Sequence, residues 1–154
     1  MSDRRSLILS LDGATWEVLD PLAEAGHLPT IASLRADGAV GALESVCPPI
    51  TAAAWLSFQT GLEPARHGVY TFSHVQNGGR ESTMVDATTI GQPTVWDYLE
   101  AEGLDTLSVN LPGTYPAKTI PGTVVSGIMA PSFDDSDAVS GDDTRSVVRN
   151  VVPD

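Results

Sequence analysis

The stretch that decides the fold runs from residue 48 to residue 61 and reads Pro48-Pro49-Ile50-Thr51-Ala52-Ala53-Ala54-Trp55-Leu56-Ser57-Phe58-Gln59-Thr60-Gly61. The two prolines hold the backbone out of the α region before the chain turns helical. Between Thr51 and Gly61 the residues are apolar nearly all round, which is typical of a helix covered by the rest of its domain. The pattern therefore predicts a buried helix that begins at Thr51 and ends at Gly61.

Thr51 places a hydroxyl at the start of this helix. The free backbone N–H groups of the first turn favour a phosphate group or a developing oxyanion at that position. Threonine is also an ordinary N-cap residue, and for Thr51 considered alone a purely capping role is the default. Whether Thr51 is a cap or a catalytic group therefore depends on the motifs in the rest of the chain.

The composition predicts one globular domain with an acidic surface. The chain has 154 residues, 42% of them hydrophobic, and no apolar run long enough to span a membrane. Its net charge is −12, with 20 acidic and 8 basic residues, and Lys118 is the only lysine. Such a charge opposes binding to nucleic acid or to anionic membranes. We expect a cytoplasmic protein. The acidic excess also suggests adaptation to high salt, which thermal unfolding at increasing KCl concentration would test.

Elements that precede the Pro-Pro loop read as alternating strands and helices, the pattern of a parallel sheet with crossover helices. Strands are predicted at residues 6–11 and 39–46, and helices at residues 14–25 and 28–38, with Pro21 starting a fresh turn in the first helix. Asp12 and Thr51 each follow one of these predicted strands. Ligands gather at the carboxyl ends of strands in open α/β sheets, so both are candidate site residues. A role for Asp12 as a helix cap stays open.

Elements after Gly61 continue this alternation. We predict a loop at residues 64–68, a hairpin through residues 82–85, a helix at 93–103, and strands at 105–110 and 123–129. His67 fits a structural role better than that of a base or ligand. The single Cys47 excludes an internal disulfide. The acidic stretch from residue 131 reads as a solvated connection, and valines at 147–152 read as the start of another element.

The ordered set of motifs resembles the type I phosphodiesterase / nucleotide pyrophosphatase branch of the alkaline phosphatase superfamily. The motifs are Leu9-Ser10-Leu11-Asp12-Gly13-Ala14, Leu28-Pro29-Thr30-Ile31, Pro48-Pro49-Ile50-Thr51, Trp55, Thr60-Gly61, Pro64, His67-Gly68 and Leu111-Pro112-Gly113-Thr114-Tyr115-Pro116. The resemblance implies an α/β, alkaline-phosphatase-like sandwich with a mostly parallel central sheet. Residues 1–130 would form the N-terminal part of its catalytic domain, and residues 131–154 would form an acidic, flexible connection to a C-terminal part.

The resemblance also implies a chemistry. Thr51 matches the nucleophile, which is itself metal-bound, and Asp12 matches the first metal-binding aspartate. Family members hold two divalent metal ions, usually zinc, with manganese as an alternative, and hydrolyse phosphodiester or pyrophosphate bonds in small phosphate esters through a phospho-threonine intermediate. His67 matches a recurrent His-Gly pair that does not bind metal.

Most of the family's metal ligands, a set of Asp and His residues, lie in the second half of much longer chains. We therefore expect the 154 residues to be the N-terminal portion of such an enzyme and inactive by themselves. An uncovered sheet edge would then favour self-association. Two alternatives stay open: a phosphomonoesterase or cofactor-independent phosphoglycerate mutase of the same superfamily, and a non-catalytic acidic α/β domain.

Overall fold

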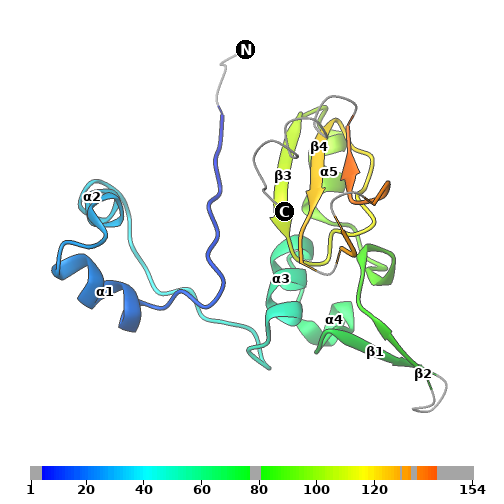
Figure 1. Ribbon diagram of the computed structural model, residues 1–154, viewed down its shortest axis with the longest axis horizontal. Helices are drawn as coiled ribbons and strands as arrows, with labels where there is room; N and C mark the ends of the chain where they lie inside the picture. Colours follow the sequence, from blue (N-terminus) through cyan, green and yellow to red (C-terminus); the bar gives the residue numbers. More distant parts are fainter. Residues whose placement is uncertain (1–4, 77–80, 129, 133–134, 142–154) are drawn as a thin grey trace. The chain divides into compact units, whose positions relative to one another are not determined.

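The computed structural model describes residues 5–76, 81–128, 130–132 and 135–141 (Figure 1). The chain divides into two compact units, Met1–Glu44 and Ser45–Asp154, which are described separately. The predicted start of an element at residues 147–152 lies outside the described residues.

Unit 1 contains two helices, α1 (Trp16–Glu24) and α2 (Pro29–Asp37). They are joined through Trp16, whose indole Nε1 donates a hydrogen bond to the Gly41 carbonyl (3.2 Å). The Arg35 guanidinium lies over the same ring, 4.7 Å from its centroid, and pairs with Asp20. Pro29 occupies the start of α2, as predicted, because a helix needs no N–H there. Pro21 lies inside α1, so the prediction that it starts a fresh turn is wrong.

The two strands predicted in this part of the chain do not form in the structure. Residues 6–11 and 39–46 carry no strand, and Leu7 and Leu9 are 90% and 82% exposed. An apolar run indicates that a segment favours burial. It does not determine which strand would pair with the segment, and a strand exists only within a hydrogen-bonded ladder. The predictions of strands at residues 6–11 and 39–46 are therefore wrong for this structure.

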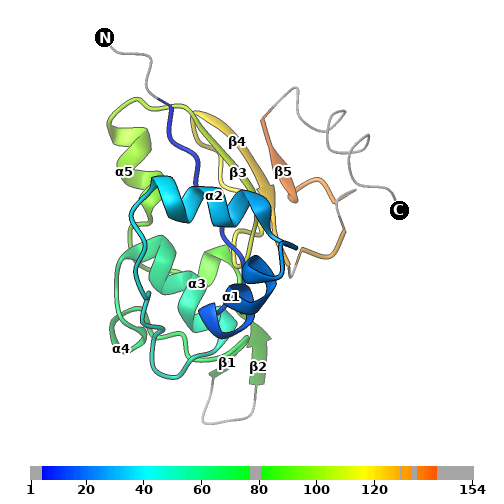
Figure 2. The same cartoon turned by 90° about the vertical axis from the view of Figure 1, so that its left-hand side faces the viewer.

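Unit 2 holds the remaining elements (Figures 1 and 2). In chain order they are α3 (Thr51–Thr60), α4 (Pro64–His67), β1 (Ser73–Gln76), β2 (Glu81–Met84), the 3-10 helix η2 (Ala87–Thr89), α5 (Val95–Ala101), β3 (Thr106–Leu111), β4 (Gly122–Ser126) and β5 (Val139–Ser140). The helix predicted from residue 51 is confirmed, and it ends as predicted at Gly61, whose φ of 68° only glycine adopts readily. The loop predicted at residues 64–68 is instead one helical turn, α4.

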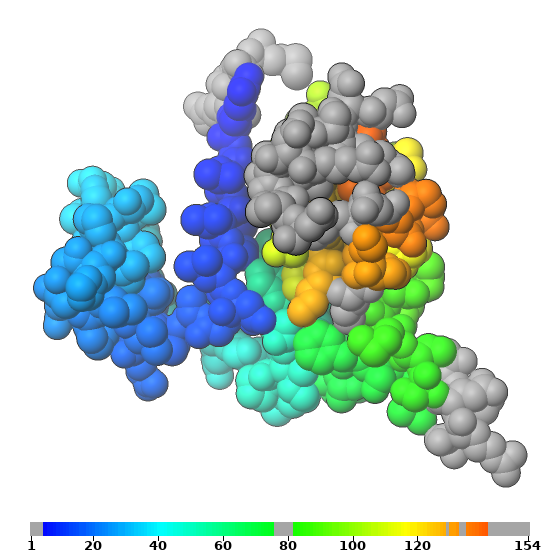
Figure 3. Space-filling model, viewed as in Figure 1, coloured from blue at the N-terminus to red at the C-terminus, as the bar shows by residue number. Residues whose placement is uncertain are grey.

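The strands form two small sheets. β1 and β2 make the predicted hairpin, which extends away from the rest of unit 2 (Figure 3). The second sheet has the order β3-β4-β5, in which β3 and β4 are parallel and β4 and β5 antiparallel. Of the three strand pairings among the described residues, only β3–β4 is parallel. The fold is mixed α/β, and the expected mostly parallel central sheet is not observed, because the predicted strands at 6–11 and 39–46 join no ladder.

The core of unit 2 has two parts. Ala52 and Leu56 of α3 pack with Val69 and Val85, and Val125 packs with Ala138 and Val139 across the β4–β5 pair. β5 falls within the acidic stretch, where the sequence pattern predicts no strand. Its burial comes from the apolar pair Ala138 and Val139, which is too short to give a periodic signal.

Candidate functional site

Thr51 is the first residue of α3, and it is half-buried. The preceding residue, Ile50, has the extended backbone of an N-cap (φ −113°, ψ 138°), and its carbonyl accepts from the Ala54 amide at 2.9 Å. Ile50 therefore occupies the N-cap position, and its side chain carries no acceptor. The default interpretation of Thr51 as the N-cap residue does not match this geometry, because Thr51 is the first helical residue. The N–H groups of this first turn have no acceptor within the helix.

The helix that carries Thr51 is fixed by its buried face. Ala52, Ala53 and Leu56 are each at most 1% exposed, and Leu56 packs into the cluster with Val69 and Val85. A helix held along this face cannot rotate without breaking the core. The orientation of the first turn is therefore set by the packing of this buried face.

His67, from α4, supports the middle of α3. It is 8% exposed, its Nδ1 accepts the Val69 N–H at 3.2 Å, and its Nε2 lies 3.0 Å from Ser57 Oγ. Because Nδ1 is an acceptor, Nε2 carries the proton and donates it toward Ser57. Burial lowers the pKa of His67, and a hydrogen bond to the Ala53 backbone partly opposes this shift. These contacts fit the structural role predicted for His67.

The last turn of α3 is tied to the loop that follows β3. Gln59 is 2% exposed, and its Nε2 donates to the Pro112 carbonyl at 2.8 Å. The loop is in turn tied to β4, because Ser126 Oγ donates to the Thr114 carbonyl at 3.0 Å. Asn110, at the end of β3, has a φ of 59° at the point where the β3–β4 register shifts.

Asp12 lies in unit 1, exposed, in the turn that it forms with Gly13. The N-cap of α1 is Thr15, whose side chain accepts the Glu17 N–H at 3.4 Å. The capping role considered for Asp12 is thus held by Thr15. Asp12 and Thr51 belong to different compact units, so their joint action stays a prediction.

The carboxylate of Asp12 and the hydroxyl of Thr51 are oxygen donors of the kind that divalent cations bind. Within the ranges that the structure describes, no group of three or more His, Cys, Asp or Glu side chains is placed to hold a metal ion. The chemistry of the two predicted donors fits a metal site to which each would contribute one ligand.

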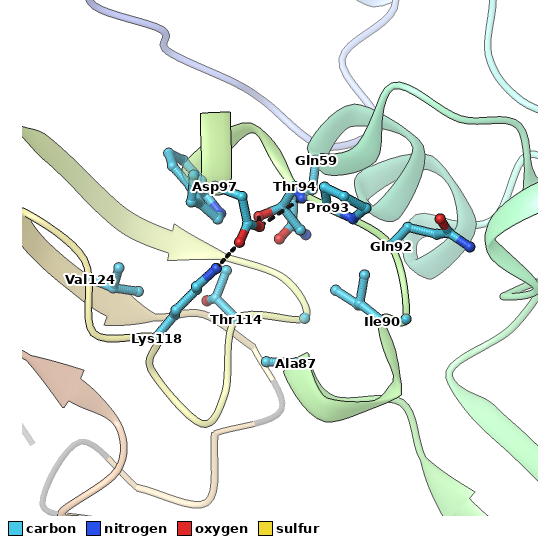
Figure 4. Close-up of a pocket in the computed structure, with 13 residues that line it drawn as sticks. Gln59, Ala87, Ile90, Gln92, Pro93, Thr94, Asp97, Thr114, Lys118 and Val124 are labelled. Carbon is cyan, nitrogen blue, oxygen red and sulfur yellow. Dashed lines mark hydrogen bonds and ion pairs between the residues drawn. The ribbon is translucent and has the colours of Figure 1, made fainter. Parts of the chain in front are cut away.

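A pocket of about 440 Å³ lies in unit 2 beside the last turn of α3 (Figure 4). Gln59 and Gly113 line it, whereas Thr51, at the opposite end of α3, does not. On its polar side the Asp97 carboxylate pairs with Lys118 and accepts from the backbone N–H (2.8 Å) and hydroxyl (2.7 Å) of Thr94. No sequence motif indicates this pocket; its one signal in the sequence is Lys118, the only lysine of the chain.

The protein class follows from comparison with known families. Residues 6–152 match the family described as type I phosphodiesterase / nucleotide pyrophosphatase, and the chain belongs to this family. The resemblance read from the motifs is thereby confirmed. No solved structure matches the chain significantly. In the described part of the chain, no helix is long and apolar enough to cross a membrane.

Proposed function

We propose that this chain supplies the nucleophile of a metal-dependent hydrolase that cleaves phosphodiester or pyrophosphate bonds. The observation that carries the proposal is the position of Thr51. It is the first residue of a helix fixed by its buried face, with the N-cap position taken by Ile50, in a chain that belongs to this family. Asp12 is proposed as a metal ligand, and Thr51 as both ligand and nucleophile.

The proposed reaction has two displacement steps. Oγ1 of Thr51 attacks the phosphorus atom, an O–P bond to Thr51 forms, and the bond to the leaving oxygen breaks. Water then attacks the phospho-threonine and regenerates the hydroxyl. First-turn N–H groups of α3 would hold the phosphoryl oxygens, aided by the positive end of the helix dipole. Divalent ions, zinc or manganese, would lower the pKa of the threonine hydroxyl and offset charge on the leaving oxygen when bound.

The fold of the whole catalytic domain, its cellular location and its substrate are proposals as well. We propose an alkaline-phosphatase-like sandwich for the intact catalytic domain, a cytoplasmic location and a small phosphate ester as substrate.

Self-association is proposed at β3, which lies at the edge of its sheet in the described residues and exposes Leu107 and Val109 (69% and 61%). Sedimentation velocity tests this: a monomer at all concentrations rejects it.

The proposed activity is tested on the intact protein with bis-p-nitrophenyl phosphate. Thr51→Ala is expected to lose about a thousandfold or more in kcat, because no other group takes over the covalent step. Thr83→Ala, which changes an exposed threonine on β2, is the matched control. A covalent phosphoryl group on Thr51, trapped by acid quench and located by mass spectrometry, is a readout separate from turnover. Retained activity in Thr51→Ala rejects the assignment.

The same experiment separates the alternatives. A strong preference for p-nitrophenyl phosphate over the diester would favour a phosphomonoesterase or mutase, which also uses a covalent phosphoryl enzyme. An intact protein that binds neither zinc nor manganese, and turns over neither substrate, would favour a non-catalytic acidic domain.

A further inference from the structure

The pocket beside the last turn of α3 is separate from the position of Thr51. Gln59 lines it, and Thr51 lies eight residues earlier on the same helix, a rise of about 12 Å. Its volume of about 440 Å³ lies within the range of about 300–1,000 Å³ that is usual for small-molecule sites. The proposed phosphoryl transfer makes no use of it.

The walls combine apolar and charged groups. Ile90, Pro93 and Val124 contribute apolar surface, and the Asp97–Lys118 pair forms a charged side (Figure 4). Trp96 also lines the pocket, and its indole N–H is buried with no hydrogen-bond partner among the described residues. The pocket therefore combines apolar walls with one charged side.

The charged side restricts the kind of ligand. Asp97 is a fixed anion, held by Lys118 and Thr94, and Lys118 is the only lysine of a chain whose net charge is −12. An anionic ligand would be repelled by the Asp97 carboxylate, and a cationic ligand would be repelled by the Lys118 ammonium. A purely apolar ligand would remove water from both charged groups without replacing its hydrogen bonds.

A neutral ligand with neighbouring hydroxyl groups meets none of these costs. One hydroxyl can donate to a carboxylate oxygen of Asp97 while its neighbour accepts from a remaining N–H of the Lys118 ammonium. The carbon face of a sugar ring suits the apolar wall at Ile90 and Pro93. We propose that this pocket is a binding site for a neutral, sugar-sized polyol. The proposal is independent of the function proposed for Thr51.

The test measures binding to the intact protein by NMR, with glucose and trehalose as neutral probes. Glucose 6-phosphate and glucosamine are matched charged probes: the first adds about two negative charges at neutral pH, and the second adds a positive charge. We expect saturable shifts of the Trp96 indole N–H signal, assigned with Trp96→Phe, at millimolar glucose or trehalose. Each charged sugar is expected to bind at least about tenfold more weakly than glucose, because it meets one uncompensated like charge.

Two glycines provide a variant and its control. A Cβ at Gly91, which lines the pocket, meets no atom within 4 Å, and the same holds for Gly41 in unit 1. Gly91→Leu is expected to weaken binding about tenfold by occupying space in the pocket, whereas Gly41→Leu is expected to leave it unchanged.

Saturable binding of a neutral sugar that Gly91→Leu weakens, and Gly41→Leu does not, supports the proposal. The absence of a saturable shift with either neutral sugar overturns it. Tighter binding of glucose 6-phosphate than of glucose also overturns it, since this would define an anion site at Lys118. Near-UV circular dichroism of each variant establishes that the pocket region is folded.

Discussion

The Nε2 of Gln59 donates a hydrogen bond of 2.8 Å to the Pro112 carbonyl, which joins the last turn of α3 to the loop after β3. The two residues are 53 positions apart in the sequence, and the bond is buried. It ties the helix that begins at Thr51 to the only parallel strand pair among the described residues. The orientation of α3 is thus set at its far end as well as along its buried face.

Replacing Gln59 with leucine is expected to destabilise the protein by about 1–3 kcal/mol, because the buried Pro112 carbonyl loses its side-chain donor. Urea denaturation followed by circular dichroism measures the effect. Gln92→Leu changes an exposed glutamine and serves as the control. Equal midpoints for the two variants would show that the bond contributes nothing to the fold.

Gly113→Ala should be destabilising by about 1–2 kcal/mol, the usual cost of the left-handed region for a residue with a side chain. Gly113 has a φ of 78°, and a Cβ there would lie 3.0 Å from Leu56 Cδ1. Gly91→Ala is the matched control, since its Cβ meets nothing within 4 Å and its φ is not positive. If differential scanning calorimetry finds no difference between the two variants, the strain at Gly113 is absent.

The buried His67 should make stability depend on pH. Burial lowers its pKa in the folded state below the ordinary value of about 6.5 that the unfolded chain has. Between the two pKa values the unfolded chain binds more protons, so the free energy of unfolding falls as the pH drops from about 6.5 through the folded pKa. Urea denaturation at a series of pH values measures this slope.

The control for this pH dependence removes one histidine at a time. His67→Gln is expected to flatten the slope below about pH 6.5, while His27→Gln, at an exposed position, is expected to preserve it. An unchanged slope in His67→Gln would assign the pH dependence to other groups.

Lys118→Met is expected to raise the pKa of Asp97. The hydrogen bond from Lys118, followed by the backbone N–H of Thr94, lowers this pKa to about 2. Removing the lysine leaves the Thr94 contacts, so we expect a value between about 2 and the ordinary 3.8. NMR titration of the Asp97 carboxyl carbon measures it, with Arg66→Met as control. An unshifted titration would show that the ion pair does not form in solution.

The same substitution has a small effect on stability. The Lys118 and Asp97 side chains are 41% and 39% exposed, and pairs exposed to this extent contribute up to about 1 kcal/mol. A depressed carboxyl pKa stabilises the folded state above the unfolded value, and this stability is lost as the pH falls toward about 2. The loss in Lys118→Met should therefore be seen at neutral pH and disappear near pH 2.

Much of the local structure was predictable because it depends on neighbours in the sequence. The start of α3 at Thr51 follows from the prolines, and its end from Gly61. The strands β3 and β4 follow from runs rich in Val, Leu and Thr between turn residues. The motifs spread along the chain likewise identified the family, which the match over residues 6–152 confirms.

Other features depend on contacts between distant segments, which no local pattern specifies. The apolar run at residues 6–11 has the composition of a strand, but a strand also needs a partner, and the ladders of the described residues do not include it. The short β5 is a strand only because β4 lies beside it. The pocket joins Gln59, Asp97 and Lys118 from three separate segments.

The sequence by itself determined the family, the buried helix that begins at Thr51, and the acidic character of the surface. Only the tertiary structure decided that Gln59 anchors the far end of α3 and that a pocket forms around Asp97 and Lys118. The physical reason is that propensities and turn residues act between neighbours in the chain, whereas burial and long-range hydrogen bonds arise only when distant segments pack.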